Sequence, residues 1–186
     1  MSLYTDYDMT CGCFLLGGES AEMEYTNIIH PFPALYDSRS KILILGSLPS
    51  VKSREQNFFY GHPQNRFWPL MAALFGEKPP KTIEEKRALA LRRHFGMWDT
   101  IYSCDIKGSS DSSIKNVVPT DLQSIIEESE ISQIFCNGQT SGKYYHRYQE
   151  KQLGMPAIVL PSTSPANAAW NMERLKQAWE VILSYL

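Results

Sequence analysis

The sequence predicts a three-layer α/β/α sandwich with a central, mostly parallel four-stranded sheet. Short apolar runs alternate with helix-like segments along the chain, which is the order expected when helices connect parallel strands. The first run, "KILILG", is almost uniformly apolar, as in a strand that is buried on both faces. In such folds ligands bind outside the carboxyl ends of the strands, so we expect the functional site in the loops that follow them.

Strands are predicted where short apolar runs end at a glycine, a proline or a polar turn. The segment 28–37 is expected to be an extended lead-in, because Pro31 and Pro33 exclude a helix there. Residues 47–66 are polar and irregular, and long loops of this kind often carry function. The four strands are expected at residues 41–46, 97–106, 131–138 and 155–162.

Helices are predicted by capping residues and by the spacing of apolar residues. Thr82 precedes Glu85, and Thr120 precedes Gln123, by the three residues of a capping box. Pro69 places the start of another helix near that residue. A further helix is expected from about residue 139, and the last helix shows one apolar stripe. The stripe consists of Met172, Leu175, Trp179, Ile182 and Leu186.

The composition indicates one globular domain. Of the 186 residues 43% are hydrophobic, and the net charge of −2 gives no global positive field that would attract nucleic acid. Residues 1–25 lack periodicity and are expected to be an N-terminal tail or extension, with residues 26–186 as a single domain. No apolar run is long enough to span a bilayer, so no membrane association is expected.

The cysteines favour a reducing compartment. Cys11, Cys13, Cys104 and Cys136 form no Cys-x-x-Cys pair, so zinc or iron–sulfur ligation is not expected. We therefore predict free thiols, no metal and a cytoplasmic location.

Two loops that follow predicted strands could bind phosphate. "GSLPS" follows the first strand, and Gly46 would allow close backbone approach, but it is not a P-loop and an ordinary turn is the alternative. "STSPAN" follows the fourth strand. Its hydroxyls and backbone N–H groups could bind phosphate oxygens, or they could simply cap the next helix.

The stretch "HPQNRFW", residues 62–68, mixes polar groups with large aromatic side chains. A helix cap by Asn65 before Phe67 would explain part of it, but not the neighbouring His62 and Arg66. No G-x-S-x-G motif is present and the histidines have no acid in sequence register, so we predict no Ser-His-Asp triad.

Four segments together resemble the uracil–DNA glycosylase superfamily, in particular its hypoxanthine–DNA (deoxyinosine) glycosylase branch. They are "KILILGSLPS", "YGHPQNRFW", "WDTIYSCDI" and "VLPSTSPAN", and the resemblance extends from His30 to Leu186. "HPxNRFW" is also similar to the mismatch-specific uracil and thymine glycosylases. Two features depart from the usual pattern. Leu48 stands where most members carry a water-positioning Asp or Asn, and "STSPAN" lacks the His of the uracil-specific enzymes.

The resemblance implies a monofunctional DNA glycosylase that flips deaminated bases out of the helix and hydrolyses their N-glycosidic bond. Hypoxanthine is the expected base, and an abasic site is the expected product. The partner would be DNA containing deaminated bases, with no cofactor, and the protein would act as a monomer. The alternatives are a uracil- or mismatch-specific glycosylase, and a non-catalytic nucleic-acid-binding module of the same fold.

The resemblance also assigns roles to individual residues. In the deoxyinosine branch the catalytic role shifts to the Asn of "HPQN", here Asn65, whose carbonyl would accept from a water and whose NH₂ would donate. Tyr60 would be the stacking platform for the base, with Phe59 as the second choice. The expected base pocket consists of Gly46, Ser47, Leu48, Pro49, Tyr60, His62, Gln64 and Ser103.

DNA contacts are expected from the loops at the strand ends. Pro165 or Ala166 stands where relatives insert a residue into the DNA stack. The expected DNA-binding residues are Ser50, Arg66, Ser162, Thr163, Ser164, Pro165, Ala166 and Asn167. Further cations near these loops could contact phosphate or remain solvated surface charges: Lys52, Arg54, Lys107, Lys115 and Lys143.

Overall fold

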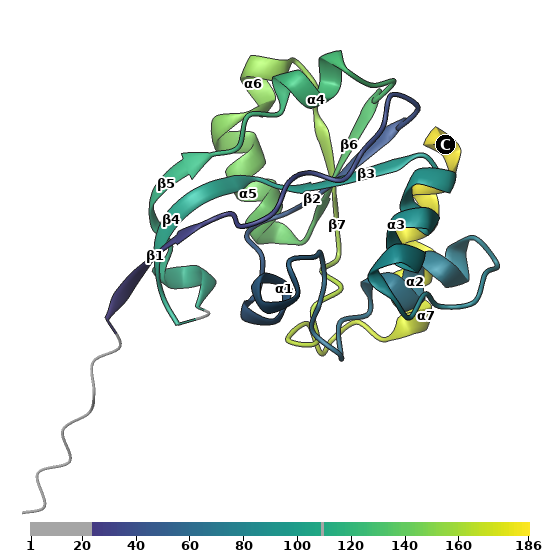
Figure 1. Ribbon diagram of the computed structural model, residues 1–186, viewed down its shortest axis with the longest axis horizontal. Helices are drawn as coiled ribbons and strands as arrows, with labels where there is room; N and C mark the ends of the chain where they lie inside the picture. Colours follow the sequence, from purple (N-terminus) through teal and green to yellow (C-terminus); the bar gives the residue numbers. More distant parts are fainter. Residues whose placement is uncertain (1–23, 109) are drawn as a thin grey trace, which may run out of the picture.

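A four-stranded parallel sheet forms the centre of the fold in the computed structural model, which describes residues 24–108 and 110–186 (Figure 1). Its strands are β2 (Ile42–Gly46), β3 (Phe95–Asp99), β6 (Gln133–Asn137) and β7 (Ala157–Leu160), in the order β3-β2-β6-β7. All three pairings are parallel. The predicted fold class is confirmed, and β2 is buried along its whole length as its apolar sequence indicated.

A second, antiparallel sheet was not predicted from the sequence. It consists of β1 (Tyr25–Ile29), β4 (Ile101–Lys107) and β5 (Lys115–Pro119), in the order β1-β4-β5. β1 begins at Tyr25, the last residue assigned above to the N-terminal tail, and residues 1–23 lie outside the described residues.

The predicted strand 97–106 is in fact two strands that meet at Thr100. Three hydrogen bonds hold the backbone of Thr100. Its N–H donates to the carbonyl of Gly46. Its carbonyl accepts from the Thr120 N–H and from the side-chain amide of Gln149. Before this point every residue of β3 is buried, and after it β4 alternates between buried and accessible residues. The chain therefore leaves the parallel sheet at Asp99, which becomes a strand end.

The loop 47–66 contains one short helix, α1 (Val51–Gln56), where an irregular segment was expected. Ser50 caps it by accepting from the Ser53 N–H. Helix α2 (Phe67–Leu74) starts two residues before Pro69, at which it was expected to begin. The predicted capping box of α3 (Ile83–Arg92), formed by Thr82 and Glu85, is confirmed.

The capping box predicted at Thr120 is wrong. Helix α4 (Gln123–Glu127) begins after Leu122, without a side-chain cap, and the Thr120 hydroxyl donates instead to the carbonyl of Asp99. The tertiary hydrogen bond to a buried strand end takes precedence over the local cap.

The remaining helices cover the parallel sheet. α5 (Gln139–Tyr148) packs on β7 and is followed by α6 (Glu150–Leu153), whereas α2 packs on α7 (Met172–Trp179). Helices α2, α3 and α7 gather to one side of the sheet and α5 and α6 to the other (Figure 1). Short 3₁₀ segments occupy Asp111–Ser113 and Glu180–Tyr185. No helix within the described ranges is long and apolar enough to cross a membrane.

One aromatic side chain connects the core to the loops above it. Phe67 is fully buried and packs edge-on against Phe95 and Trp179. Burial of such a side chain stabilises the fold by about 1.5–3 kcal/mol. On its other side, the ring of Tyr60 stacks on Phe67 with ring centroids 4.0 Å apart. The position of Tyr60 is therefore set by the core.

Candidate active site

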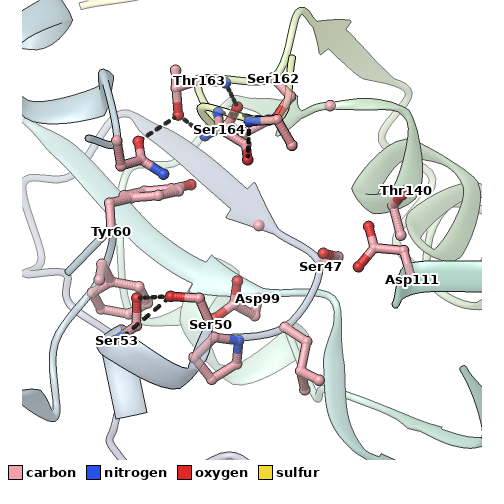
Figure 2. Close-up of a pocket in the computed structure, with 18 of the residues that line it drawn as sticks. Ser47, Ser50, Ser53, Tyr60, Asp99, Asp111, Thr140, Ser162, Thr163 and Ser164 are labelled. Carbon is pink, nitrogen blue, oxygen red and sulfur yellow. Dashed lines mark hydrogen bonds between the residues drawn. The ribbon is translucent and has the colours of Figure 1, made fainter. Parts of the chain in front are cut away.

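A cavity of about 630 Å³ lies at the carboxyl edge of the parallel sheet, the place where a ligand site was expected. Its size suits a small organic ligand. The carboxyl ends of β2, β3 and β6 and the loops after β2, β6 and β7 all contribute to its wall. In Figure 2, Ser162, Thr163 and Ser164 lie on one side, Ser50 and Ser53 lie opposite, and Thr140 and Asp111 lie toward a third side.

The wall after β2 contains the "GSLPS" residues. Gly46, Ser47, Leu48 and Pro49 all line the cavity, as expected. A Cβ at Gly46 would collide with Oδ1 of Asp99, so only glycine allows this carboxylate to approach the strand end. Ser50 also lines the cavity, while its hydroxyl caps α1.

Asn65 lies at the edge of the cavity with its carbonyl occupied. Its Oδ1 accepts from the backbone N–H of Phe67 and from the hydroxyl of Thr163, each at 3.0 Å. A backbone N–H can only donate, so this contact fixes which end of the amide is oxygen. The carbonyl that was expected to hold a water is committed to the protein, and the NH₂ group is the end that Asn65 can offer to a ligand.

Thr163 joins the ends of two strands. Its backbone N–H donates to Oδ1 of Asn137, the last residue of β6, and its hydroxyl accepts from Nδ2 of the same side chain at 2.9 Å. Thr163 is fully buried, so its hydroxyl orients Asn65 and is not available for the phosphate contact expected of it.

Arg66 has a structural role in place of the expected DNA contact. Its guanidinium donates to the carbonyls of Thr163, Ser164, Asn167 and Trp170. These carbonyls belong to the loop that follows β7. Arg66 therefore holds this loop against the start of α2, beside Asn65.

Tyr60 lines the cavity with a neutral hydroxyl. Its backbone is in the left-handed region, at φ 52°, and its ring is fixed by Phe67. Burial, and then the nearby charge of Asp99, raise the pKa of Tyr60 well above its ordinary value. Phe59 is buried and also contributes to the cavity wall.

Two polar strand ends in the cavity wall were given no role from the sequence, although Asn137 begins the segment "NGQT", which was expected at a strand end. Asp99 ends β3 and Asn137 ends β6. The carboxylate of Asp99 is bonded to the buried ring of His30, with Nε2 and Oδ2 2.7 Å apart. Asp99 was overlooked because the strand was expected to continue to residue 106. The fully apolar run before it was the signal that the buried strand ends there.

Five of the expected site residues lie outside the cavity wall: His62, Gln64, Arg66, Ser103 and Pro165. The His62 ring accepts from the Gln64 N–H and so closes a local turn, and Gln64 is exposed. Ser103 belongs to the second sheet, where it pairs with Ile29. Pro165 is exposed on the loop after β7, whereas its neighbours Ser164 and Ala166, with Ser162 and Asn167, line the cavity.

Most of the expected cations are occupied elsewhere. Lys52 pairs with Glu55, and Lys107 and Lys115 lie over the ring of Tyr25. Arg54 is the one of this set that lines the cavity, where it also donates to the Pro49 carbonyl. No cluster of three or more possible metal ligands occurs among the residues that the structure describes.

A parallel α/β sheet with a ligand-sized cavity at its carboxyl edge defines the large class of open α/β folds that bind ligands at this edge. Within it, residues 33–183 match the family model described as the uracil DNA glycosylase superfamily, and the chain belongs to this superfamily. A protein from Methanosarcina acetivorans named hypoxanthine DNA glycosylase is 33% identical over 156 residues, covering 83% of this chain and 97% of the relative.

Two further comparisons agree with this family assignment. A hypoxanthine DNA glycosylase from Methanosarcina barkeri is 32% identical over 151 residues, covering 80% of this chain and 93% of the relative. A solution NMR structure of a candidate uracil DNA glycosylase from M. acetivorans is similar with a TM-score of 0.71 and 33% identity. That comparison covers 82% of this chain and 94% of the other.

Proposed function

We propose that the protein is a monofunctional DNA glycosylase that removes deaminated bases, hypoxanthine first, and leaves an abasic site. The observation that carries the proposal is the NH₂ of Asn65 at a cavity that is also lined by the Tyr60 ring. The superfamily, and the names of two relatives at 32–33% identity, support the same reaction class.

The base must leave the DNA stack before it can enter the cavity. Flipping costs a few kcal/mol, and less for a deaminated, poorly paired base. Stacking on an aromatic ring returns roughly 1–3 kcal/mol per base. Tyr60 can supply such a ring without rearrangement, because Phe67 already fixes it. We therefore assign Tyr60 the stacking role.

Hydrolysis then separates charge across the glycosidic bond. The oxygen of a water bonds to C1′ of the sugar, the C1′–N9 bond breaks, and its electron pair leaves with the purine, which then takes up the proton that the water releases. Negative charge develops on the base, and preorganised neutral donors stabilise it. Asn65 is such a donor: Phe67 and Thr163 hold its carbonyl, so its NH₂ needs little reorganisation as the base departs.

The decisive assay uses duplex DNA with one deoxyinosine, followed by alkali to cleave abasic sites. The wild type should give strand scission and Asn65→Ala should give very little. Scission no greater than that of an undamaged duplex would contradict the proposal. Lesion-independent binding without scission would instead support a non-catalytic nucleic-acid-binding module.

A uracil- or mismatch-specific enzyme is the second candidate. It is favoured by the similarity to the M. acetivorans structure described as a candidate uracil DNA glycosylase. Release of hypoxanthine, uracil, thymine and xanthine should be compared in one assay. Uracil release without hypoxanthine release would replace the first candidate with this one.

A further inference from the structure

A buried hydrogen bond between His30 and Asp99 gives the cavity a fixed hydrogen-bond acceptor. The side chains of His30 and Asp99 are 0% and 7% exposed. The His30 ring bonds on both sides: Nδ1 lies 2.9 Å from the carbonyl oxygen of Phe32, and Nε2 lies 2.7 Å from Oδ2 of Asp99. His30 follows β1, so the second sheet brings this ring to Asp99.

Counting protons shows what Asp99 can present to a ligand. A carbonyl oxygen only accepts, so Nδ1 of His30 carries a hydrogen. The remaining proton lies between Nε2 and Oδ2, on one atom or the other. In both states the other oxygen, Oδ1, bears no hydrogen. Because Asp99 lines the cavity, its free oxygen is an acceptor in either state.

The position of Oδ1 matches the far edge of an inserted base. It lies directly over Gly46, where a side chain would exclude it, and the Tyr60 hydroxyl reaches the same point. Asp99 is 5% exposed, whereas Ser50 and Ala166 at the cavity wall are exposed. The sugar and phosphates of a flipped nucleotide must remain at the open side. The six-membered ring of a bound purine is therefore expected to point toward Asp99.

We propose that Asp99 selects bases that carry a hydrogen on the ring nitrogen of that edge, and that His30 keeps it an acceptor. Hypoxanthine and xanthine have an N1–H and uracil has an N3–H, whereas adenine and cytosine present a lone pair there. A lone pair against Oδ1 is repelled and leaves two buried groups without a partner. The inference rests on the proposed function and specifies its substrate class.

His30 acts through Asp99 and is a positioning residue. The imidazole keeps the proton that the pair shares on the Oδ2 side of the carboxyl group. Without it, a carboxyl group that takes up a proton can place that hydrogen on Oδ1 and donate it to the bare N1 of adenine. Replacement of His30 is therefore expected to relax discrimination against adenine, rather than only to weaken binding.

The first experiment measures binding of free bases, which does not depend on catalysis. Hypoxanthine, 1-methylhypoxanthine and adenine are titrated into the wild-type protein by calorimetry, and hypoxanthine should bind best by at least roughly 100-fold, within the range that such polar sites achieve. Adenine has no added bulk at N1, so it separates hydrogen bonding from steric exclusion by the methyl group. Equal affinity for hypoxanthine and adenine would overturn the inference.

The second experiment uses three variants. Asp99→Ala should abolish the preference for hypoxanthine. Asp99→Asn should keep most of it, because neutral His30 has a bare Nε2 that accepts from the new amide and leaves the amide oxygen over Gly46. His30→Phe should lower the ratio of hypoxanthine to adenine binding. Asp105→Asn is the matched control. Asp105 is a carboxylate of β4 that accepts from Asn27 and Asn116, and its replacement should leave the ratio of hypoxanthine to adenine binding unchanged.

The outcomes distinguish this inference from the proposed function. Selective base binding without excision of deoxyinosine would contradict the function and leave the acceptor role intact. Excision of deoxyinosine without selective base binding would support the proposed function and contradict the acceptor role of Asp99. If Asp99→Ala slowed excision of every base equally and kept the binding preference, Asp99 would act on the chemistry and the inference would be wrong. Thermal melting confirms that each variant is folded. If His30→Phe does not fold, Asp99→Asn still tests the inference.

Discussion

The cavity wall that contains Asn65, Thr163 and Asn137 is held by contacts between distant parts of the chain, whereas the opposite wall at Ser50 and Ser53 is held by local ones. In the first wall, Thr163 bonds to residues 26 and 98 positions away. In the second, Ser50 caps its own helix three residues on. The first wall therefore sets the relative positions of three loops, while the second can form largely by itself.

This difference indicates where a substitution should affect function. Loss of a contact in the long-range wall leaves buried polar groups without partners and shifts loops relative to one another. Loss of a contact in the local wall affects one six-residue helix. The expected effects therefore decrease from Asn65, through Arg66 and Thr163, to Ser50.

The largest effect on the rate of excision is expected for Asn65→Asp. A carboxylate can still accept from the Phe67 N–H and the Thr163 hydroxyl, so the wall should keep its structure. The donor is lost, and negative charge is placed near a departing anion. We expect deoxyinosine excision under single turnover to fall about 100–1,000-fold, as for loss of one preorganised donor.

The matched control for this prediction is Gln64→Glu. It makes the same chemical change at an exposed neighbour outside the cavity wall and should leave the rate unchanged. Full activity of Asn65→Asp would mean that the carbonyl, and not the NH₂, is the active end of the side chain.

Arg66→Met should be the most destabilising of these changes. It removes a cation that donates to four carbonyls of one loop, and hydrogen bonds to charged groups contribute about 1.5–3 kcal/mol each. Part of this is recovered by hydration of the loop, so we expect a loss of about 3 kcal/mol in urea unfolding. Arg92→Met, which breaks an exposed ion pair with Glu77, should cost at most about 1 kcal/mol. Similar losses for the two variants would argue against the holding role of Arg66.

Thr163→Val tests the connection between Asn137 and Asn65 with little change in volume. The hydroxyl at the centre of this wall is removed, so Asn137 loses an acceptor and Asn65 loses a donor. We expect about 1–2 kcal/mol of stability to be lost, and excision to fall by roughly 10-fold because Asn65 is less well oriented. In a double-mutant cycle with Asn65→Asp the effects on excision should not be additive. Additive effects would show that Thr163 does not act through Asn65.

The difference between local and long-range contacts also explains which features could be predicted from the sequence. The capping box at Thr82 and the buried strand at residues 42–46 depend on neighbours along the chain, and both are present. The cap predicted at Thr120 failed because its hydroxyl bonds to Asp99, a residue 21 positions away. Local rules hold where no distant partner competes for the same group.

The site followed the same rule. The loop after β2 was predicted from its place after a buried strand, and Tyr60 and Asn65 were predicted through the family resemblance; all of them line one cavity. Asp99 and its partner His30 were missed, because their 69-residue separation shows no pattern in the sequence. Arg66 was expected to contact DNA because a cation in a loop gives no indication that four carbonyls surround it.

Ser50→Ala should have the smallest effect, since it changes only the local wall. The Ser53 N–H loses its cap, which costs about 1 kcal/mol in thermal or urea unfolding. Asn65, Tyr60 and Thr163 keep all their contacts, so the single-turnover rate of excision should stay within about 2-fold of the wild type, a difference below roughly 0.5 kcal/mol. Ser50 was also expected to contact DNA, and it lines the cavity from an exposed position. A 10-fold or greater fall in DNA affinity, which is about 1.4 kcal/mol, with an unchanged rate would contradict this purely structural role. It would show that the wall at Ser50 and Ser53 binds the DNA strand in addition to capping α1.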